Sequence, residues 1–176
     1  MTLERDDLVR ELVSGNDPIL HQKTEDFDFL NPPIDPIELT HMLAQTCLKH
    51  NGLGLAAPQI GLPYRAFIIK ANPMICMFNP KIVGESLGED YMEEGCLSYP
   101  NLVIKIKRPT VVRVRYTQPN ADIKTERYEG MTARIIQHEV NHLDGITFQQ
   151  RATQYHLEVA KKRKRRMEKK LNRSLT

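Results

Sequence analysis

The chain has 176 residues, of which 40% are hydrophobic and 27% charged, as expected for one globular domain. No apolar run is long enough to cross a bilayer, and the acidic start at residues 1–7 is unlike a secretory signal or a transit peptide. We therefore expect a cytoplasmic protein with no membrane partner. Three widely spaced cysteines argue against a disulfide framework and favour a reducing compartment.

The charge is unevenly distributed. Residues 151–176 carry ten Lys/Arg against two Glu, a local net charge of +8, whereas the other 150 residues have a net charge of −5. This pattern favours a polyanionic partner for the tail alone, and we expect no DNA partner for the protein.

The first predicted helix follows turn signals at 14–18 and 31–33. Asp35 is suited to the N-cap and Pro36 to the first helical position, and Asn51-Gly52 ends the helix. Its spacing predicts one buried face, made by Leu39, Met42, Leu43, Thr46 and Cys47.

The remaining predicted elements are strands followed by two helices. Strands are predicted at 65–70, 74–79, 102–107 and 110–117, a helix at 131–143 ended by Gly145, and a last helix from about 153. An apolar face is predicted on this last helix, formed by Tyr155, Val159, Met167, Leu171 and Leu175. We expect an α+β fold in which antiparallel or mixed sheets wrap around the helix at 131–143, between an N-terminal and a C-terminal helix. Residues 1–150 would be one catalytic domain, with 151–176 as its basic C-terminal helix.

The segment His138-Glu139-Val140-Asn141-His142 carries the clearest chemistry. Histidines four apart on a helix project from one face within reach of a single ion, and the Glu139 carboxylate can reach a water on that ion. Two surface histidines on a polar helix face are the plain alternative. The apolar character of the 131–143 helix argues against it.

A catalytic metal site needs a third protein ligand. Downstream of His142 the chain offers only His156, on the basic helix, whereas Cys96 lies in Glu94-Gly95-Cys96-Leu97-Ser98. A thiolate is a strong ligand for zinc or ferrous ion. A lone cysteine is more often core packing, the reading we adopt for Cys47 and Cys76, but the paired histidines favour Cys96 as a ligand.

Small residues dominate the segment 52–61, whose sequence is Gly-Leu-Gly-Leu-Ala-Ala-Pro-Gln-Ile-Gly. Low side-chain bulk leaves backbone accessible for pairing with an extended peptide. Gln59 could donate its amide to an oxyanion, although a structural glutamine is the ordinary alternative. A phosphate-binding loop is disfavoured because no strand precedes it and no Lys-Ser/Thr follows.

These three segments together resemble the motifs of the peptide deformylases, which remove the formyl group from N-formyl-methionine of new polypeptides. The family pattern appears here as 52–59, 94–98 and 137–142, in this order, and the similarity extends over most of residues 15–150. The resemblance implies one divalent metal held by Cys96, His138 and His142. The residues alone would suggest zinc first, whereas the family implies ferrous ion in the cell, replaceable by zinc, nickel or cobalt.

The resemblance also implies a mechanism. Metal-bound hydroxide attacks the formyl carbon, the Leu97 N–H and the Gln59 amide stabilise the oxyanion, and Glu139 passes the water's proton to the departing amine. The implied binding site for the formyl-methionyl peptide is formed by Leu53, Gly54, Met92, Gly95, Met131 and Ile135, with the edge of His138.

This chain departs from the family pattern at two positions. Asn141 replaces the usual Asp before the second histidine, and we expect it to keep a hydrogen bond while weakening an ionic network with Glu94 and Arg108. Val103 stands where some members have an arginine near the substrate mouth, so the resemblance implies nothing about the peptide preference beyond methionine.

Other functions remain open at this point. A solvated polar helix is the plain reading of the tail, and ribosome binding through residues 156–176, as in some deformylases, is the functional one. An ordinary metallopeptidase is the rival enzyme, which Cys96 disfavours as third ligand. A ribosome-associated pseudoenzyme is the rival without activity, which the presence of Glu139 and all three ligands disfavours.

Overall fold

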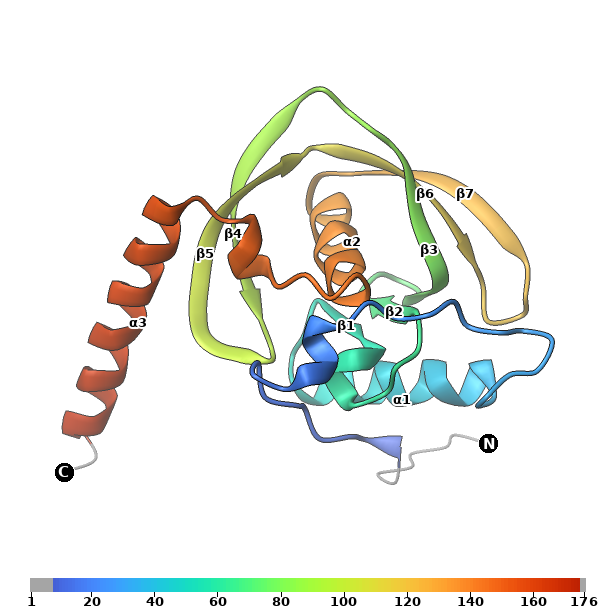
Figure 1. Ribbon diagram of the computed structural model, residues 1–176, viewed down its shortest axis with the longest axis horizontal. Helices are drawn as coiled ribbons and strands as arrows, with labels where there is room; N and C mark the ends of the chain where they lie inside the picture. Colours follow the sequence, from blue (N-terminus) through green and yellow to red (C-terminus); the bar gives the residue numbers. More distant parts are fainter. Residues whose placement is uncertain (1–7, 175–176) are drawn as a thin grey trace.

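The computed structural model describes residues 8–174, so the acidic start at 1–7 and Leu175 lie outside the described part (Figure 1). Its α-helices and strands in chain order are α1 (Pro36–Lys49), β1 (Gly54–Ala56), β2 (Ala66–Ile69), β3 (Ile75–Glu85), β4 (Glu89–Cys96), β5 (Tyr99–Pro109), β6 (Val111–Thr117), β7 (Ile123–Glu129), α2 (Gly130–Leu143) and α3 (Gln154–Ser174).

Two antiparallel sheets surround α2, which confirms the expected α+β fold (Figure 1). One sheet has five strands in the order β1-β2-β3-β6-β7, and β4 pairs with β5 in a two-stranded sheet. The four strands predicted individually are present as β2, β3, β5 and β6. Strands β1, β4 and β7 were not predicted individually.

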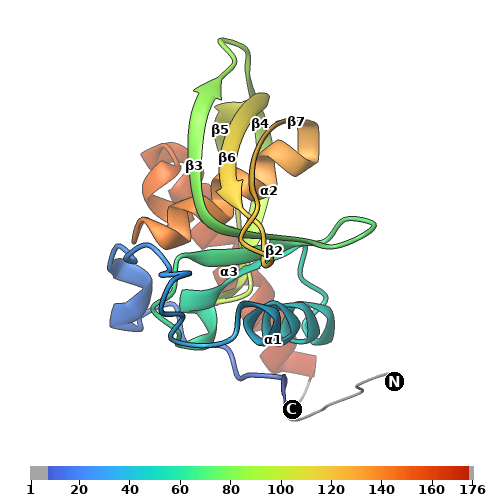
Figure 2. The same cartoon turned by 90° about the vertical axis from the view of Figure 1, so that its right-hand side faces the viewer.

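Strand β2 lies at the centre of the core and is buried along its whole length. Side chains alternate between the two faces of a strand. Ala66 and Ile68 therefore pack in the cluster that contains α1, while Phe67 and Ile69 pack in the cluster that contains α2. In Figure 2, α1 lies below β2 and α2 above it. One strand thus fixes both helices in relation to each other.

The predicted signals of α1 are confirmed. The Asp35 carboxylate accepts hydrogen bonds from the N–H groups of Ile37 and Glu38, at 2.7 and 3.4 Å, and such a cap contributes about 1 kcal/mol. The buried residues of this helix are the five expected ones.

Helix α2 ends where the sequence predicts. Gly145 has a φ of +69°, and a Cβ there would lie 2.7 Å from the backbone of Gln22. Only glycine combines this left-handed conformation with such a close approach. The C-terminal end of α2, which carries His142, is therefore held against residues 21–22.

Helix α3 stands beside β5 at one edge of the molecule (Figure 1). Ala160 and Leu157 pack with Phe148 and the apolar residues of β5. The predicted apolar face is wrong as a buried face, because Tyr155, Val159, Met167 and Leu171 are all exposed. None of the described helices is long and apolar enough to cross a membrane.

Candidate active site

Helix α2 carries the paired histidines on the side that faces β4 and β1. His138, Glu139 and His142 are 7%, 3% and 1% exposed. The His138 and His142 rings meet edge to face, with centroids 5.0 Å apart. Four-residue spacing on a helix brings the two rings together in this way.

Cys96, the last residue of β4, completes this group. Its Sγ lies 3.2 Å from Nε2 of His142, and one ligand atom from each of Cys96, His138 and His142 lies within 4.8 Å of the others. A thiolate and two imidazoles suit a divalent transition metal, and three ligands leave a coordination position for water. The donor set and its spacing therefore fit a catalytic metal.

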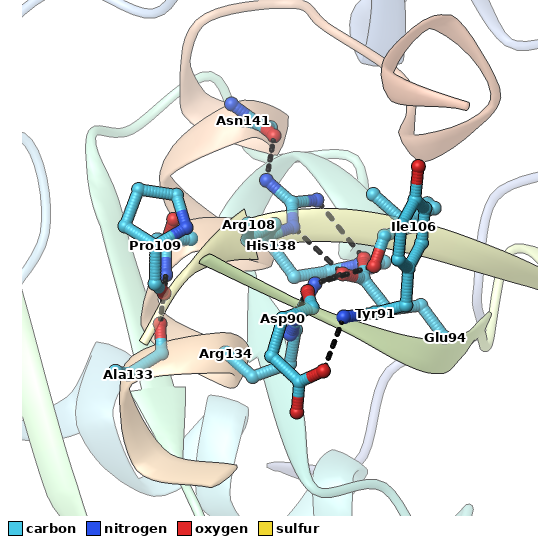
Figure 3. Close-up of polar contacts among 11 residues, drawn as sticks. Asp90, Tyr91, Glu94, Ile106, Arg108, Pro109, Ala133, Arg134, His138 and Asn141 are labelled. Carbon is cyan, nitrogen blue, oxygen red and sulfur yellow. Dashed lines mark hydrogen bonds and ion pairs between the residues drawn. The ribbon is translucent and has the colours of Figure 1, made fainter. Parts of the chain in front are cut away.

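The Nδ1 atom of His138 is held by a buried ionic network (Figure 3). His138 Nδ1 lies 3.1 Å from the Oε2 of Glu94, which leaves Nε2 of the ring for a metal. Arg108 donates to both carboxylate oxygens of Glu94, at 2.7 and 2.9 Å. Burial by itself would raise the pKa of Glu94, but the hydrogen bonds from His138 and Arg108 lower this pKa to about 2.

Arg134 is a second cation on Glu94 that was missed in the sequence. Its Nη1 donates to Oε1 of Glu94 at 3.0 Å and to the carbonyl of Ile106 at 2.9 Å. Arg134 precedes His138 by one helical turn, so both side chains reach the same carboxylate. That four-residue spacing is the signal by which it could have been found.

The Glu139 carboxylate lies in a setting that favours proton transfer. Burial raises the pKa of Glu139 to about 7. Oε2 has no hydrogen-bond partner among the described residues, and Oε1 lies 2.5 Å from the position that a Cβ of Gly54 would occupy. Because Gly54 has no side chain, Glu139 has room beside β1. A base with a pKa near neutrality can both accept and return a proton.

Gln59 presents its amide nitrogen to the metal ligands. Its Oε1 accepts a hydrogen bond from the Ala56 N–H at 2.9 Å, which fixes the orientation of the amide. Nε2 consequently lies 3.5 Å from Sγ of Cys96 and 3.4 Å from Oγ of Ser98. Leu97 opens the turn after β4, where the register pairs Cys96 with Tyr99 and leaves the Leu97 N–H outside the ladder.

A cavity of about 450 Å³ opens beside these groups. We call it the substrate cavity. Of the residues predicted to bind substrate, six line it: Leu53, Gly54, Gly95, Met131, Ile135 and His138. Met92 does not line the cavity, because the part of β4 that lines the cavity begins at Glu93. Val103 does, together with lining residues not predicted from the sequence: Asn51, Tyr99, Pro100, Asn101 and Leu102.

Fold and site together define a class of protein. A candidate metal site of one thiolate and two imidazoles adjoins a carboxylate of raised pKa, an amide donor and a largely apolar cavity. This arrangement is that of a hydrolase that activates water on a metal.

Comparisons with known proteins give the family. The profile of the polypeptide deformylase family matches residues 9–158. A peptide deformylase of Natranaerobius thermophilus is 36% identical over 146 residues, covering 82% of this chain and 92% of that protein. The chain belongs to the polypeptide deformylase family.

Solved structures agree with this assignment. A peptide deformylase of Synechococcus elongatus in complex with actinonin has a TM-score of 0.80 at 29% identity, covering 86% of this chain and 85% of that one. A Met-Ala-Ser-bound peptide deformylase of Acinetobacter baumannii has a TM-score of 0.76 at 30% identity, covering 81% and 98%. The protein is therefore a deformylase, an enzyme of the metal-dependent hydrolase class, and neither rival function is favoured.

Proposed function

We propose that this protein removes the formyl group from the N-terminal formyl-methionine of new polypeptides, with Cys96, His138 and His142 holding one divalent metal ion. The observation that carries this assignment is the convergence of their three ligand atoms within 4.8 Å, next to Glu139. We propose ferrous ion in the cell, replaceable by zinc, nickel or cobalt. Bound there, the metal supplies Lewis-acid activation of a water molecule.

The residues around that ion divide the remaining work. Glu139 takes the proton of the attacking water and delivers it to the departing amine, for which a pKa of about 7 is suited. Gln59 Nε2 and the Leu97 N–H donate to the oxyanion that develops on the formyl oxygen. Glu94 and Arg108 hold His138 in one orientation.

The substrate side is formed by the substrate cavity. Leu53, Met131 and Ile135 supply apolar surface for a methionine side chain, and Gly54 and Gly95 keep the backbone of the site accessible to a peptide. The Acinetobacter relative with bound Met-Ala-Ser supports a methionyl peptide as the ligand class.

The decisive experiment measures deformylation of formyl-Met-Ala-Ser under anaerobic conditions. We expect Glu139→Gln and Glu139→Ala to lose about 10²- to 10⁴-fold in kcat with metal content unchanged, because the proton carrier is removed. Glu93→Gln is the matched control, since Glu93 lines the same cavity but pairs outward with Arg163 at 2.9 Å. Equal rates in wild type and Glu139→Ala would exclude this mechanism, and cleavage of unformylated Met-Ala-Ser would favour a metallopeptidase.

We further propose that residues 151–176 are a basic appendage of the catalytic domain that docks on the ribosome in the bacterial cytoplasm. The cations of α3 support this, because phosphate neutralisation rewards concentrated positive charge. Deleting residues 156–176 would also remove Leu157 and Ala160 from the core. A better test replaces four exposed cations by Gln, namely Lys162, Arg165, Arg166 and Lys169. Salt-sensitive ribosome co-sedimentation should be lost while hydrolysis of formyl-Met-Ala-Ser is kept; undiminished co-sedimentation would refute the proposal.

A further inference from the structure

A second cavity, of about 800 Å³, borders a different face of α2 from the substrate cavity. Gln137, Val140 and Asn141 of α2 line it, and it shares no lining residue with the substrate cavity. We call it the rear cavity. Arg108, which belongs to its wall, is the same residue that holds Glu94. The rear cavity is thus separate from the catalytic groups yet adjoins the network that orients His138.

The charged side chains of the rear cavity do not cancel. Six cations line it: Lys23, Arg65, Lys81, Lys107, Arg108 and Arg151. Four carboxylates oppose them: Asp26, Glu85, Glu89 and Asp144. Three of these acids already have cationic partners, in the pairs Arg65–Asp144, Lys107–Glu89 and Lys81–Asp26. Among the described residues, Lys23 and Arg151 have no ion-pair partner, and neither does the fourth acid, Glu85, so the wall still carries a small excess of positive charge.

Arg108 extends from this wall into a buried group in which two guanidinium groups share one carboxylate. Glu94 is one carboxylate that receives hydrogen bonds from two guanidinium groups, Arg108 and Arg134, and all three are buried. The remaining partner of Arg108 is Asn141, which is neutral. A buried charge without a counter-charge is costly. An anion entering from the rear cavity would supply that counter-charge.

Hydrogen-bond donors for such an anion are available beside Arg108 and Asn141 in the rear cavity. Oδ1 of Asn141 accepts from Nη1 of Arg108 at 2.7 Å, so the other end of the amide is the donor Nδ2, which points away from Arg108 in Figure 3. Nδ2 has no hydrogen-bond partner in residues 8–174, and Asn141 is 6% exposed. Arg108 has five N–H donors, of which the contacts to Glu94 and Asn141 occupy three.

We propose that the rear cavity binds a phosphate-type oxyanion, held by the Asn141 amide and Arg108 at its base and by Lys23 and Arg151 at its rim. The fork of a guanidinium suits an oxyanion with several acceptor oxygens, and the volume accommodates phosphate or a phosphate ester. Bound there, the anion holds Arg108 in place, and Arg108 holds the Glu94 carboxylate on His138. The occupied cavity therefore stabilises the metal-binding arrangement without touching substrate.

Inorganic phosphate is the probe for the test. Calorimetric titration and thermal unfolding of the metal-loaded enzyme are compared in phosphate and in chloride at equal ionic strength. We expect saturable binding and a melting temperature that rises with phosphate concentration. Transfer of the metal to a chelator should become slower in phosphate. These readouts do not depend on catalytic activity.

Three variants locate the binding. Asn141→Asp should weaken phosphate binding by at least about tenfold, because its carboxylate supplies the missing charge and repels the anion. Lys23→Gln should weaken binding by about threefold and leave deformylation unchanged, since one rim charge contributes less than a buried one. Lys162→Gln on α3, with the same loss of charge outside the cavity, should bind like wild type.

Three results would overturn the proposal. One is the absence of phosphate binding at millimolar concentration. A second is equal affinity in wild type, Asn141→Asp and Lys23→Gln. The third is competition between phosphate and formyl-Met-Ala-Ser, which would place the anion at the metal in the substrate cavity.

Discussion

Nη1 of Arg108 donates a hydrogen bond of 2.7 Å to Oδ1 of Asn141, and this contact joins β5 to α2 one residue before His142. The same guanidinium contacts both oxygens of Glu94, whose Oε2 lies 3.1 Å from His138. A neutral amide at 141 therefore takes part in the network that orients one metal-site histidine and borders the other.

Asn141→Asp should stabilise the protein in chloride buffer. A carboxylate would form a charge-assisted hydrogen bond to Arg108, worth roughly 1 kcal/mol more than the neutral one. For a chain of this size we expect a melting temperature higher by about 2–4 °C, and slower loss of metal to a chelator. Asn141→Leu, which removes the acceptor, should lower the melting temperature and make the loss of metal faster. Unchanged melting and metal loss in the Asp variant would contradict this account.

The thiols should report metal removal. Burial raises the pKa of Cys76 to about 12 and that of Cys47 to about 11, so neither provides a reactive thiolate at neutral pH. Cys96 is partly exposed in the substrate cavity. A thiol reagent should modify no cysteine in the metal-loaded enzyme, Cys96 alone after chelation, and all three after denaturation. Mass spectrometry identifies the modified residue; equal labelling of Cys96 with and without metal would argue against it as a ligand.

The sequence predicted those elements whose signals are local. Asp35 and Pro36 mark the start of α1, and the apolar spacing of α1 matches its buried face. Strand β4, by contrast, has the sequence Glu-Asp-Tyr-Met-Glu-Glu-Gly-Cys, which is rich in residues of low strand propensity. It forms because it pairs along its length with β5 and because its buried Glu94 is neutralised by distant arginines. Such partners do not appear in a local pattern.

Sequence reasoning was also limited where packing partners decide the outcome. The apolar residues singled out on α3 are exposed, because Ala160 and Leu157, which were not among them, are the ones that pack with β5 and Phe148. In the candidate site, the three sequence motifs correctly predicted which residues lie around Cys96. The lining residues 99–102 were missed, because they form the start of β5, a segment that bears no motif.

Gly54→Ala should impair catalysis by displacing Glu139. The added Cβ would lie 2.5 Å from Oε1 of Glu139 and 2.8 Å from Cγ2 of Ile135, both too close for real contacts. A shift of about 1 Å in a catalytic group can cost 10²-fold, so we expect a loss of this order in kcat/KM. Overpacking should lower the unfolding free energy by about 1–3 kcal/mol. Gly88→Ala is the control, since its Cβ would meet only Thr110 at 3.5 Å, and it should retain full activity. An active Gly54→Ala enzyme would show that Glu139 tolerates movement.

The pH dependence of stability should reveal a cluster remote from the site, in which Tyr128 and Tyr116 donate to one oxygen of Glu126 at 2.6 and 2.8 Å. These bonds, from Tyr128 foremost, lower the pKa of Glu126, while burial and Glu126 raise the pKa of Tyr128. The carboxylate's contribution is therefore present above about pH 4.5 and is lost as the pH falls through the lower folded value. The phenol's contribution is present below about pH 10 and is lost as the pH rises through the higher folded value.

Glu126→Gln removes the charged acceptor from both phenols. We expect the difference in unfolding free energy between wild type and this variant to be greatest between about pH 5 and 9 and to shrink on either side of that window. Urea unfolding at a series of pH values, with metal content held constant, measures it. Tyr116→Phe serves as a companion variant, because it removes one of the two donors and should reduce the acid-side loss without abolishing it. A difference that stays constant from about pH 3 to pH 11 would mean that the hydrogen bonds contribute nothing to the titration of either group.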